Sequence, residues 1–451
     1  MHKPMYLPDH ILGCIRALTA QGFDAYVVGG CVRDHCLDLV PHDYDMCTAA
    51  LPEQTEQVFA DHRLVLAGKK HGTIGVVTED DVVEITTFRT EGDYRDNRHP
   101  EWVRFVPHVE QDLARRDFTV NAMAYSPAHG FADPFGGRED LDHHILRAVG
   151  DPRQRFREDS LRILRGVRFA VRFGPTPEAE TEKAMFSLAP LMDNLARERV
   201  FDELCKLLPL ITAEDLIRFA PIITQVIPEL APTLGFDQRC RYHRHDLYTH
   251  IALVVEHTPA DLTLRWAALL HDVGKPQSMT VDEAGQAHYY GHAARSAEMA
   301  DIILRRLKAP TALRQQVVTL IEKHMTLPQP EKKFLRRWLG KLGWDTMDAL
   351  LYLQIADSIA TGTDHEAELS LFGEVRSLLQ QIREEDSCLS IKDLALNGHD
   401  LMALGYSGKA IGQSLTLLLN LVLEEQCENT RDALICALRR SDSPPTSINK
   451  E

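Results

Sequence analysis

The first fifty residues carry the pattern that most constrains the fold of this chain: strand, glycine break, helix, strand. The apolar run Ala25–Val28 predicts a buried strand, and Gly29-Gly30 ends it. Residues 32–39 predict one short helix, and a second strand is expected to begin near Asp43. Alternation of strands and helices in this way predicts an α/β domain.

Asp43 and Asp45 lie two positions apart in the second predicted strand, so both carboxylates are expected on one face. This spacing suits Mg²⁺, which usually keeps several waters and takes further ligands from substrate phosphates. Gly29 and Gly30 let the backbone approach an anion, and the next helix start offers free N–H groups. The layout favours a nucleoside triphosphate held between a glycine turn and a metal. An Asp-x-Asp pair taken alone is more often a solvated turn.

Length and composition indicate a multidomain protein of the cell interior. A chain of 451 residues is too long for one hydrophobic core, and roughly three domains are expected. Nine scattered cysteines without a Cys-x-x-Cys pair indicate reduced thiols. No apolar stretch is long enough to span a membrane, and the N-terminus lacks the features of a secretion signal. The expected location is therefore cytoplasmic.

The net charge of −16 disfavours nucleic acid as a partner, because such binding depends on neutralising phosphates. Local charge matters more than the total, and two basic segments stand out, at 147–172 and 332–341. Either segment can hold an RNA along one path or form a solvated helix face. The second interpretation is the simpler one for the second segment taken alone, whose cations are Lys332, Lys333, Arg336, Arg337 and Lys341.

Further polar segments follow in the first half. They are Lys70-His71-Gly72-Thr73 at the start of a strand, the charged loop 92–100, Arg115–Ala122 at the start of a helix, and the turn Asp133–Gly137. Glu84 lies on the predicted strand 82–88. It is either a third acid near the aspartate pair or, more simply, a half-exposed strand residue.

The predicted helix 156–169 carries acceptors and donors on one side. Asp159 and Arg162 lie three positions apart and share a face, which Arg165 and Arg168 extend. Aspartate offers acceptors and arginine offers donors in a fixed fork, so such a pair can complement a nucleobase edge. A pair at this spacing is, taken alone, more often an ordinary surface ion pair.

The second half is predicted to be helical and contains a dispersed set of histidines and aspartates. The apolar helix 265–270 ends at His271-Asp272, and the full set is His250, His271, Asp272, His292, His324 and Asp357. These side chains form either a metal site or a polar core whose members satisfy one another.

Through these motifs, taken in order, the chain resembles the bacterial class II tRNA nucleotidyltransferases, the CCA-adding enzymes and their poly(A) polymerase relatives. The motifs are Gly-Gly-x-Val-Arg-Asp at 29–34, Asp-x-Asp at 43–45, Lys-His-Gly-Thr at 70–73, Arg-Arg-Asp-Phe-Thr-x-Asn-Ala at 115–122, Asp-Pro-Phe-Gly-Gly at 133–137 and Glu-Asp-x-x-Arg at 158–162. The likeness runs from about residue 22 to 208. The remainder resembles members of the family that contain an HD domain.

The resemblance implies that Asp43 and Asp45 bind the catalytic Mg²⁺ ions, which orient the α-phosphate and activate the 3′-hydroxyl of the RNA. It implies that Asp159 and Arg162 act as an amino-acid template for the base of CTP and then of ATP. The loop 92–100 matches the flexible loop needed to add the terminal A, which argues against an enzyme restricted to C. Further nucleotide contacts are implied for Gly30, Arg33, Arg116, Arg165 and Arg168.

The implied fold class is α+β, with a DNA polymerase β-like head followed by helical domains. The expected parts are a nucleotidyltransferase head (1–147), a helical neck for base recognition and RNA binding (148–208), a helical body with an HD domain (209–365), a helical tail (366–440) and a disordered end (441–451). The HD resemblance implies metal ligands at His250, His271, Asp272 and Asp357, with His292 and His324 as additional candidates. This donor set suits Mn²⁺, Ni²⁺, Fe²⁺ or Zn²⁺ better than Ca²⁺.

The expected function is addition and repair of the 3′-terminal CCA of tRNA with CTP and ATP, without a nucleic-acid template. An A-adding enzyme and a poly(A) polymerase are the nearest alternatives. The segment Lys70–Thr73 and the loop 92–100 favour CCA addition over polyadenylation. From other classes, an HD phosphohydrolase and a non-catalytic tRNA-binding module stay open. The expected partner is the acceptor arm and elbow of tRNA, recognised by shape and phosphates; no membrane is expected, and the oligomeric state is unspecified.

Overall fold

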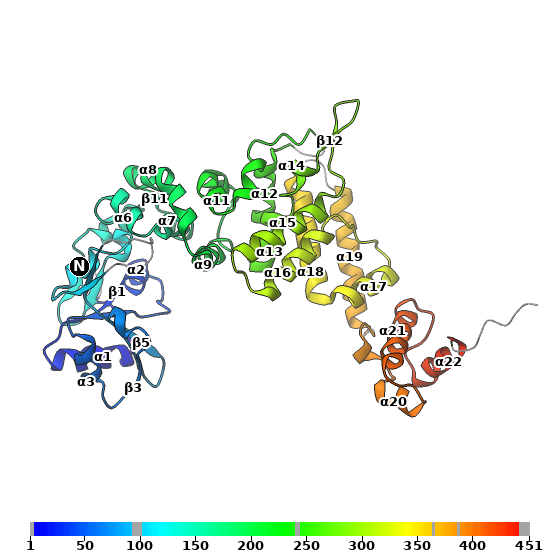
Figure 1. The fold of residues 1–451 in the computed structure, drawn as a ribbon, viewed down its shortest axis with the longest axis horizontal. Coiled ribbons are helices and arrows are strands. Elements are labelled where there is room, and N and C mark those ends of the chain that lie inside the picture. The colour runs from blue at the N-terminus through cyan, green and yellow to red at the C-terminus, as the bar shows by residue number, and fades with distance from the viewer. Residues whose placement is uncertain (1–3, 93–101, 240–243, 363–365, 386–387, 442–451) are drawn as a thin grey trace, which may run out of the picture. The chain divides into compact units, whose positions relative to one another are not determined.

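The computed structural model describes residues 4–92, 102–239, 244–362, 366–385 and 388–441. The chain divides into two compact units, here called unit 1 (up to residue 231, with 306–308) and unit 2 (232–305 and from 309 on). Figure 1 shows a sheet in the N-terminal part and helices in the rest. The mixed sheet with its helices and the helical remainder confirm the predicted α+β class. Most of the loop 92–100 and the predicted disordered end lie outside the described residues.

Unit 1 begins with a seven-stranded sheet of strand order β3-β4-β5-β2-β1-β8-β9. Neighbours run antiparallel except β2 and β5, which run parallel. The strands are β1 (Ala25–Val28), β2 (Met46–Thr48), β3 (Arg63–Val65), β4 (Thr73–Val77), β5 (Val82–Thr87), β8 (Ala124–Ser126) and β9 (Gly130–Ala132). Two small pairs lie outside this sheet: β6 (Arg89–Glu91) with β7 (Val103–Phe105), and β10 (Ile145–Leu146) with β11 (Thr176–Pro177).

Helices precede, connect and follow the strands of this sheet in the first 233 residues. They are α1 (Asp9–Ala20), α2 (Gly30–Cys36), α3 (Pro52–Val58), α4 (Val109–Leu113), α5 (Gly137–Asp142), α6 (Pro152–Glu158), α7 (Leu161–Phe173), α8 (Ala179–Leu188), α9 (Arg197–Leu207), α10 (Ala213–Arg218) and α11 (Ala220–Val226). Short 3₁₀ turns are η1 (Lys69–His71), η2 (Thr119–Asn121), η3 (Ala189–Asn194) and η4 (Pro228–Thr233).

Strand β1 is apolar throughout because both of its faces are covered. Ala25 and Val27 pack into one core, and Tyr26 and Val28 pack into another on the opposite face. Each fully buried Val of this strand contributes about 1.5–3 kcal/mol. The predicted buried strand is confirmed, and its end is fixed firmly beside the Gly29 turn.

Two predicted helices are wrong. Residues 115–122 form only η2, because the backbone there bonds to a neighbouring segment: Thr119 N donates to the Arg147 carbonyl, and Phe118 bridges to Ala148. The predicted helix 156–169 is two helices, with Asp159 between them in an extended conformation. The Asp159 carboxylate accepts the N–H of Leu161 (3.1 Å), a local bond that competes with helix continuation.

Among its described residues, unit 2 is helical apart from one short antiparallel pair, β12 (Thr280–Val281) with β13 (Ala287–His288). Its helices are α12 (Leu247–His257), α13 (Leu262–Leu270), α14 (Lys275–Ser278), α15 (His292–Arg306), α16 (Thr311–Lys323), α17 (Lys332–Leu342), α18 (Trp344–Ala360), α19 (Glu366–Glu384), α20 (Gly398–Ala403), α21 (Lys409–Leu423) and α22 (Arg431–Ser441), with the turn η5 (Ile391–Asp393). In the described part of the chain, no helix is both long and apolar enough to cross a membrane.

Two aspartates set the start points of the helices that carry the histidines. Asp246 accepts the N–H groups of Tyr248 and Thr249 at the start of α12, and Asp261 accepts that of Leu264 at the start of α13. These caps place His250 in the first turn of α12. They also place His271 directly after the last turn of α13.

Candidate functional site

Asp43 and Asp45 lie directly before β2, not within it, and both residues are exposed. The Asp45 carbonyl accepts the N–H of Val28 (2.9 Å), so this segment runs beside the end of β1. Because Met46 lies opposite Ile85 in the parallel pair β2–β5, the preceding position brings Asp45 beside Glu84. Partial burial and the charges of Asp43 and Glu84 raise the pKa of the Asp45 carboxyl.

Three carboxylates therefore concentrate negative charge where β1 ends. A divalent cation relieves such repulsion, and oxygen ligands are those that Mg²⁺ prefers. The donor set thus fits a hard divalent ion. The sequence left open whether Glu84 is a third acid near the aspartate pair or a half-exposed strand residue. In the structure Glu84 is exposed and also lies next to the pair.

Gly29 makes the turn between β1 and α2 with a positive φ of 78°, a conformation that favours glycine. A Cβ atom at this position would lie 2.8 Å from Nη1 of Arg116. The Arg116 guanidinium therefore lies directly over the turn, and its charge partly opposes the rise in the pKa of Asp45. Arg116 and the start of α2 bring positive charge and backbone N–H groups to the spot that the carboxylates border.

Arg33, one of the nucleotide contacts that the resemblance implies, is buried and faces protein groups. Its guanidinium donates to Asp34 (3.0 and 2.7 Å) and to Asn121, and it lies over the ring of Phe173, 4.4 Å from the centroid. Burial lowers its pKa. Here Arg33 joins α2 to α7 and to η2, so the structure gives it a supporting position below the turn.

Asp159 and Arg162, the predicted base template, lie at the break between α6 and α7. Arg162 is buried and donates to Glu158 (2.8 Å) and to the backbone carbonyls of Arg155 (3.1 Å) and Arg115 (2.9 Å). Asp159 instead pairs with Arg199 of α9, with the shorter N–O distance at 2.7 Å. Asp159 and Arg162 are thus held by different partners, and the shared helix face predicted for them is wrong.

Arg165 and Arg168, both predicted nucleotide contacts, also form ion pairs within unit 1. Arg165 donates to Asp117 through Nε (2.8 Å) and Nη2 (2.6 Å), and Arg168 pairs with the buried Glu203 of α9. Although burial opposes a charge on Asp117, Arg165 and Asn121 hold its pKa well below the ordinary value. These pairs fix α7 against its surroundings.

Unit 2 brings all six predicted ligands of the HD resemblance together. His250 Nε2 lies 3.0 Å from Asp357 Oδ1, and His271 Nε2 lies 3.2 Å from Asp272 Oδ2. The other oxygen of Asp272 lies 3.3 Å from His292 Nε2 and 3.8 Å from His324 Nε2. Two triads have ligand atoms within 4.8 Å of one another: His250, His271 and Asp272, and Asp272, His292 and His324.

Backbone carbonyls orient three of the imidazoles. Nδ1 of His271, His292 and His324 lies 2.8, 2.8 and 2.6 Å from the carbonyls of Ala268, Tyr289 and Ile321. This arrangement leaves each Nε2 directed at the cluster centre, as in metal-ligating histidines. The three Nε2 atoms are buried and make no hydrogen bond of good geometry with described protein atoms. The donor set therefore fits a transition-metal ion.

The charges of the cluster support the same conclusion. Burial opposes a charge on His271, but Asp272 and Asp357 outweigh it and raise its pKa, whereas burial and His271 lower the pKa of His324 to about 4. In the protein alone, a proton on His271 thus balances the carboxylates, as a cation could do. Lys275 adds a second positive charge, 2.6 Å from Asp272.

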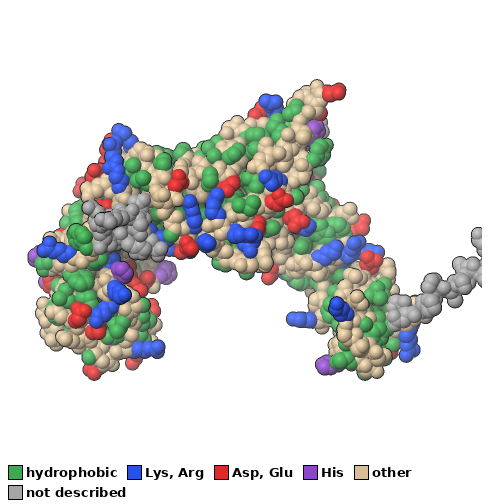
Figure 2. All heavy atoms as spheres, in the orientation of Figure 1, with side chains coloured by type: hydrophobic (Ala, Val, Ile, Leu, Met, Phe, Trp, Pro, Cys, Tyr) green, Lys and Arg blue, Asp and Glu red, His purple; other side chains and the backbone are tan. Residues whose placement is uncertain are grey.

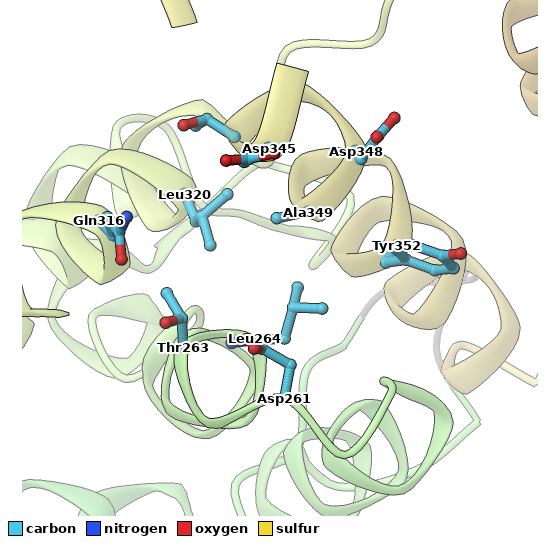
Figure 3. A pocket seen from close by; sticks show the side chains of 10 residues that line it. Asp261, Thr263, Leu264, Gln316, Leu320, Asp345, Asp348, Ala349 and Tyr352 are labelled. Carbon is cyan, nitrogen blue, oxygen red and sulfur yellow. Dashed lines mark hydrogen bonds between the residues drawn. The ribbon is translucent and has the colours of Figure 1, made fainter. Parts of the chain in front are cut away.

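A separate cavity in unit 2, of about 360 Å³, lies between α13, α16 and α18 (Figure 3). Leu264, Leu320 and Tyr352 contribute apolar surface to its lining, and the carboxylates Asp261 and Asp345 stand around it. No Lys or Arg is among its lining residues. An acidic lining repels phosphates, so this cavity does not suit a nucleotide.

Comparisons with known proteins assign both the sheet-containing head and much of the helical remainder to known domain families. Three family models match: the poly A polymerase head domain at residues 25–147, the probable RNA and SrmB-binding site of polymerase A at 176–233, and the putative tRNA nucleotidyltransferase domain 2 at 291–438. The CCA-adding enzyme of Geobacillus kaustophilus is 31% identical over 441 residues, covering 96% of both chains. The chain belongs to the CCA-adding enzyme family.

Other members of the family extend the comparison. The CCA-adding enzyme of Geobacillus stearothermophilus is 38% identical over 303 residues, 63% of this chain and 70% of that one. The crystal structure of the Bacillus stearothermophilus CCA-adding enzyme in complex with CTP superposes with a TM-score of 0.70 at 28% identity, covering 97% and 98% of the two chains. Nucleotidyltransferases of this family use a divalent metal, in agreement with the carboxylates before β2.

The HD assignment stays a prediction, because the third family model begins at residue 291, after His271 and Asp272. Two partners of the site were missed from sequence: Arg199, which pairs with Asp159, and Glu203, which pairs with Arg168. Arg199 and Glu203 lie four positions apart, which indicates that they share one face of a helix. The spacing does not indicate which other helix that face contacts.

Proposed function

We propose that this chain adds and repairs the 3′-terminal CCA of tRNA, using CTP and ATP and releasing diphosphate at each step. The observation that carries the proposal is the placement of Asp43 and Asp45 before β2, beside the Gly29 turn that Arg116 covers. Family membership over nearly the whole chain supports the same function. Relatives have been solved with CTP, with ATP and with tRNA, which makes these molecules the proposed ligands.

In the proposed mechanism, Asp43 and Asp45 would hold Mg²⁺, with Glu84 next to them. The chemistry that a bound ion would supply there is Lewis-acid polarisation of a phosphate oxygen and easier deprotonation of the 3′-hydroxyl. Arg116 and the first N–H groups of α2 bind the β- and γ-phosphates and hold the leaving diphosphate in line. Gly30, at the start of α2, leaves space beside these phosphates.

Base selection is assigned to Asp159 and Arg162. A carboxylate accepts from the exocyclic amino group that cytosine and adenine share, and a guanidinium donates to their ring nitrogen. Uracil and guanine carry a carbonyl in place of the amino group and an N–H in place of the accepting ring nitrogen. In the same position they therefore leave both the carboxylate and the guanidinium unpaired. Arg33, Arg165 and Arg168 are proposed to support this pocket, Arg33 through α2 and the other two through α7.

An A-adding enzyme and a poly(A) polymerase are the nearest alternatives. The test is extension of three tRNAs, ending before CCA, after C and after CC, with CTP, ATP or both and Mg²⁺. Ordered addition of C, C and A that then stops is expected. Extension only of the tRNA ending in CC would indicate an A-adding enzyme, and a long A tail would indicate polyadenylation. No addition to any primer would overturn the proposed transfer.

A second activity is proposed for unit 2, metal-dependent hydrolysis of a phosphoester at the HD cluster. The specific observation is that Nε2 of four histidines lies within 3.0–3.8 Å of a carboxylate oxygen of Asp272 or Asp357. Asp357 retains 22% exposure of its side chain, so the cluster is accessible from its side. Hydrolysis of bis-p-nitrophenyl phosphate with Mn²⁺ or Ni²⁺, lost on Asp272→Ala, is the expected result. Equal hydrolysis rates in the wild type and Asp272→Ala would contradict the proposed hydrolysis and would assign the cluster a structural role.

The tRNA partner is proposed to contact the neck, body and tail through local basic groups. Figure 2 shows Lys and Arg side chains in several separate groups with acidic side chains between them. On α17, Lys332 and Arg336 already pair with Glu385 (2.5 and 2.7 Å), whereas Lys333 and Arg337 are exposed. The exposed pair is therefore the proposed phosphate contact, and a cytoplasmic location follows from this substrate.

A further inference from the structure

Helix α9 presents two opposite charges to the template region, one turn apart. Arg199 forms a two-point ion pair with Asp159, with Nη2–Oδ2 at 2.7 Å and Nη1–Oδ1 at 3.3 Å. Glu203 pairs with Arg168 of α7. Side-chain exposures of 26% for Arg199 and 17% for Asp159 leave this pair largely shielded from water. Shielding strengthens an ion pair and fixes its geometry.

The two oxygens of Asp159 are almost fully used by the protein. Arg199 donates to both oxygens, and the N–H of Leu161 donates to Oδ1 at 3.1 Å. An ionised carboxylate offers about four acceptor positions, so roughly one is left, in a direction that Arg199 determines. Arg162, in contrast, is oriented by Glu158 and by two backbone carbonyls, with no part played by α9.

We propose that Arg199 is the positioning residue that sets nucleotide choice, by holding Asp159 so that its remaining acceptor position meets the amino group of cytosine or adenine. This inference rests on the proposed CCA addition. Without Arg199 the carboxylate turns about its side-chain torsions, and the penalty against uracil and guanine falls. Arg199 itself touches no reacting atom.

The test uses the full chain with Arg199→Ala, Arg199→Gln and Arg199→Lys, and Arg197→Ala as the matched control. Arg197 lies on the same helix and donates to the backbone carbonyl of Asp193 at an exposed site. The measurement is kcat and KM for CTP and UTP on tRNA ending before CCA, and for ATP and GTP on tRNA ending in CC. Melting temperatures establish that each variant is folded, and Arg199→Gln serves if Arg199→Ala is not.

For Arg199→Ala we expect the KM of CTP and ATP to rise about tenfold or more, and the CTP/UTP preference to narrow by a similar factor. Arg199→Lys restores part of the preference, and Arg197→Ala matches the wild type. In an Asp159→Ala background, removing Arg199 produces no further loss of preference, because both changes act through one group.

Two results would overturn the inference. One is an unchanged preference with a uniform fall of kcat for all four nucleotides, which a merely structural role produces. The other is full additivity with Asp159→Ala. If the wild type itself adds no C or A to any primer, the proposed function fails instead, so the two failures are distinguishable.

Discussion

Asp43 and Asp45 are exposed near the end of β1. In unit 2, by contrast, the four histidines and two aspartates of the HD cluster meet within a helical core. In unit 1 the protein supplies only part of a coordination shell. In unit 2 it supplies four imidazoles, three of which have Nδ1 bonded to a backbone carbonyl.

This difference separates a site completed by its substrate from a site assembled in advance. An open pair of carboxylates leaves positions for phosphate oxygens and waters, which suits Mg²⁺ and a nucleotide that enters and leaves at each cycle. A buried, oriented cluster suits a metal that stays bound. Each prediction below tests one side of this contrast.

The largest effect is expected in the open site. Asp45→Asn keeps the shape but removes the charge, and should reduce single-turnover addition of AMP to tRNA ending in CC by about 10³-fold, or about 4 kcal/mol. Glu84→Gln, which alters the neighbouring carboxylate, should cost less, about tenfold. Equal losses for both would show that Glu84 is a full partner of the aspartate pair.

In the preassembled site, Asp272→Ala should abolish retention of Mn²⁺ or Ni²⁺ through gel filtration, because an Asp272 oxygen lies within 3.8 Å of Nε2 of each of the four histidines. Metal content by mass spectrometry is the measurement. The same variant should add CCA within about twofold of the wild type. A variant that keeps its metal would refute the assigned ligand set.

Asp117→Asn tests how strongly the ion pair with Arg165 holds α7 in place near the aspartate pair. Leaving the half-buried Arg165 without its anionic partner should lower the free energy of unfolding of unit 1 by about 1–2 kcal/mol, measured by denaturant titration. Since the folded pKa of Asp117 is depressed, its stabilisation is present at neutral pH. It should fade as the pH falls below about 4, the ordinary value for an unfolded Asp.

Metal addition should stabilise the two units differently. Mn²⁺ or Ni²⁺ at a hundred times its dissociation constant should stabilise unit 2 by about 2.7 kcal/mol and raise its melting temperature. Mg²⁺ at the same concentration should leave unit 2 unchanged, because the imidazole-rich cluster prefers transition metals. A rise with Mg²⁺ alone would remove the distinction between the sites.

The smallest effect is expected on α17. Lys333→Ala with Arg337→Ala should reduce the salt dependence of tRNA binding by about two ions, measured by fluorescence titration. Lys332→Ala with Arg336→Ala should instead weaken packing near α19, because these two cations pair with Glu385. Identical slopes for both double variants would show that the ion pairs do not decide which cations meet RNA.

The family resemblance predicted the fold class, and local patterns predicted β1, because it is buried on both faces and its apolar run is unambiguous. The second strand was expected near Asp43 but begins at Met46. The sequence also predicted the six residues that meet in unit 2. It could not predict the break at Asp159, where a side chain competes with the helix, nor the pairing with Arg199 forty positions away. The position of Arg33 below the turn was likewise hidden, since its partners Asn121 and Phe173 are distant in sequence.

The most direct test of the two-site account is one crossed measurement of CCA addition. The wild type, Asp43→Ala/Asp45→Ala and His271→Ala/Asp272→Ala would each extend a tRNA ending before CCA with CTP, ATP and Mg²⁺. The account predicts complete CCA for the wild type and the His271/Asp272 variant, and no addition by the Asp43/Asp45 variant. Addition that survives loss of both aspartates, or that disappears with the unit 2 cluster in a folded protein, would contradict it.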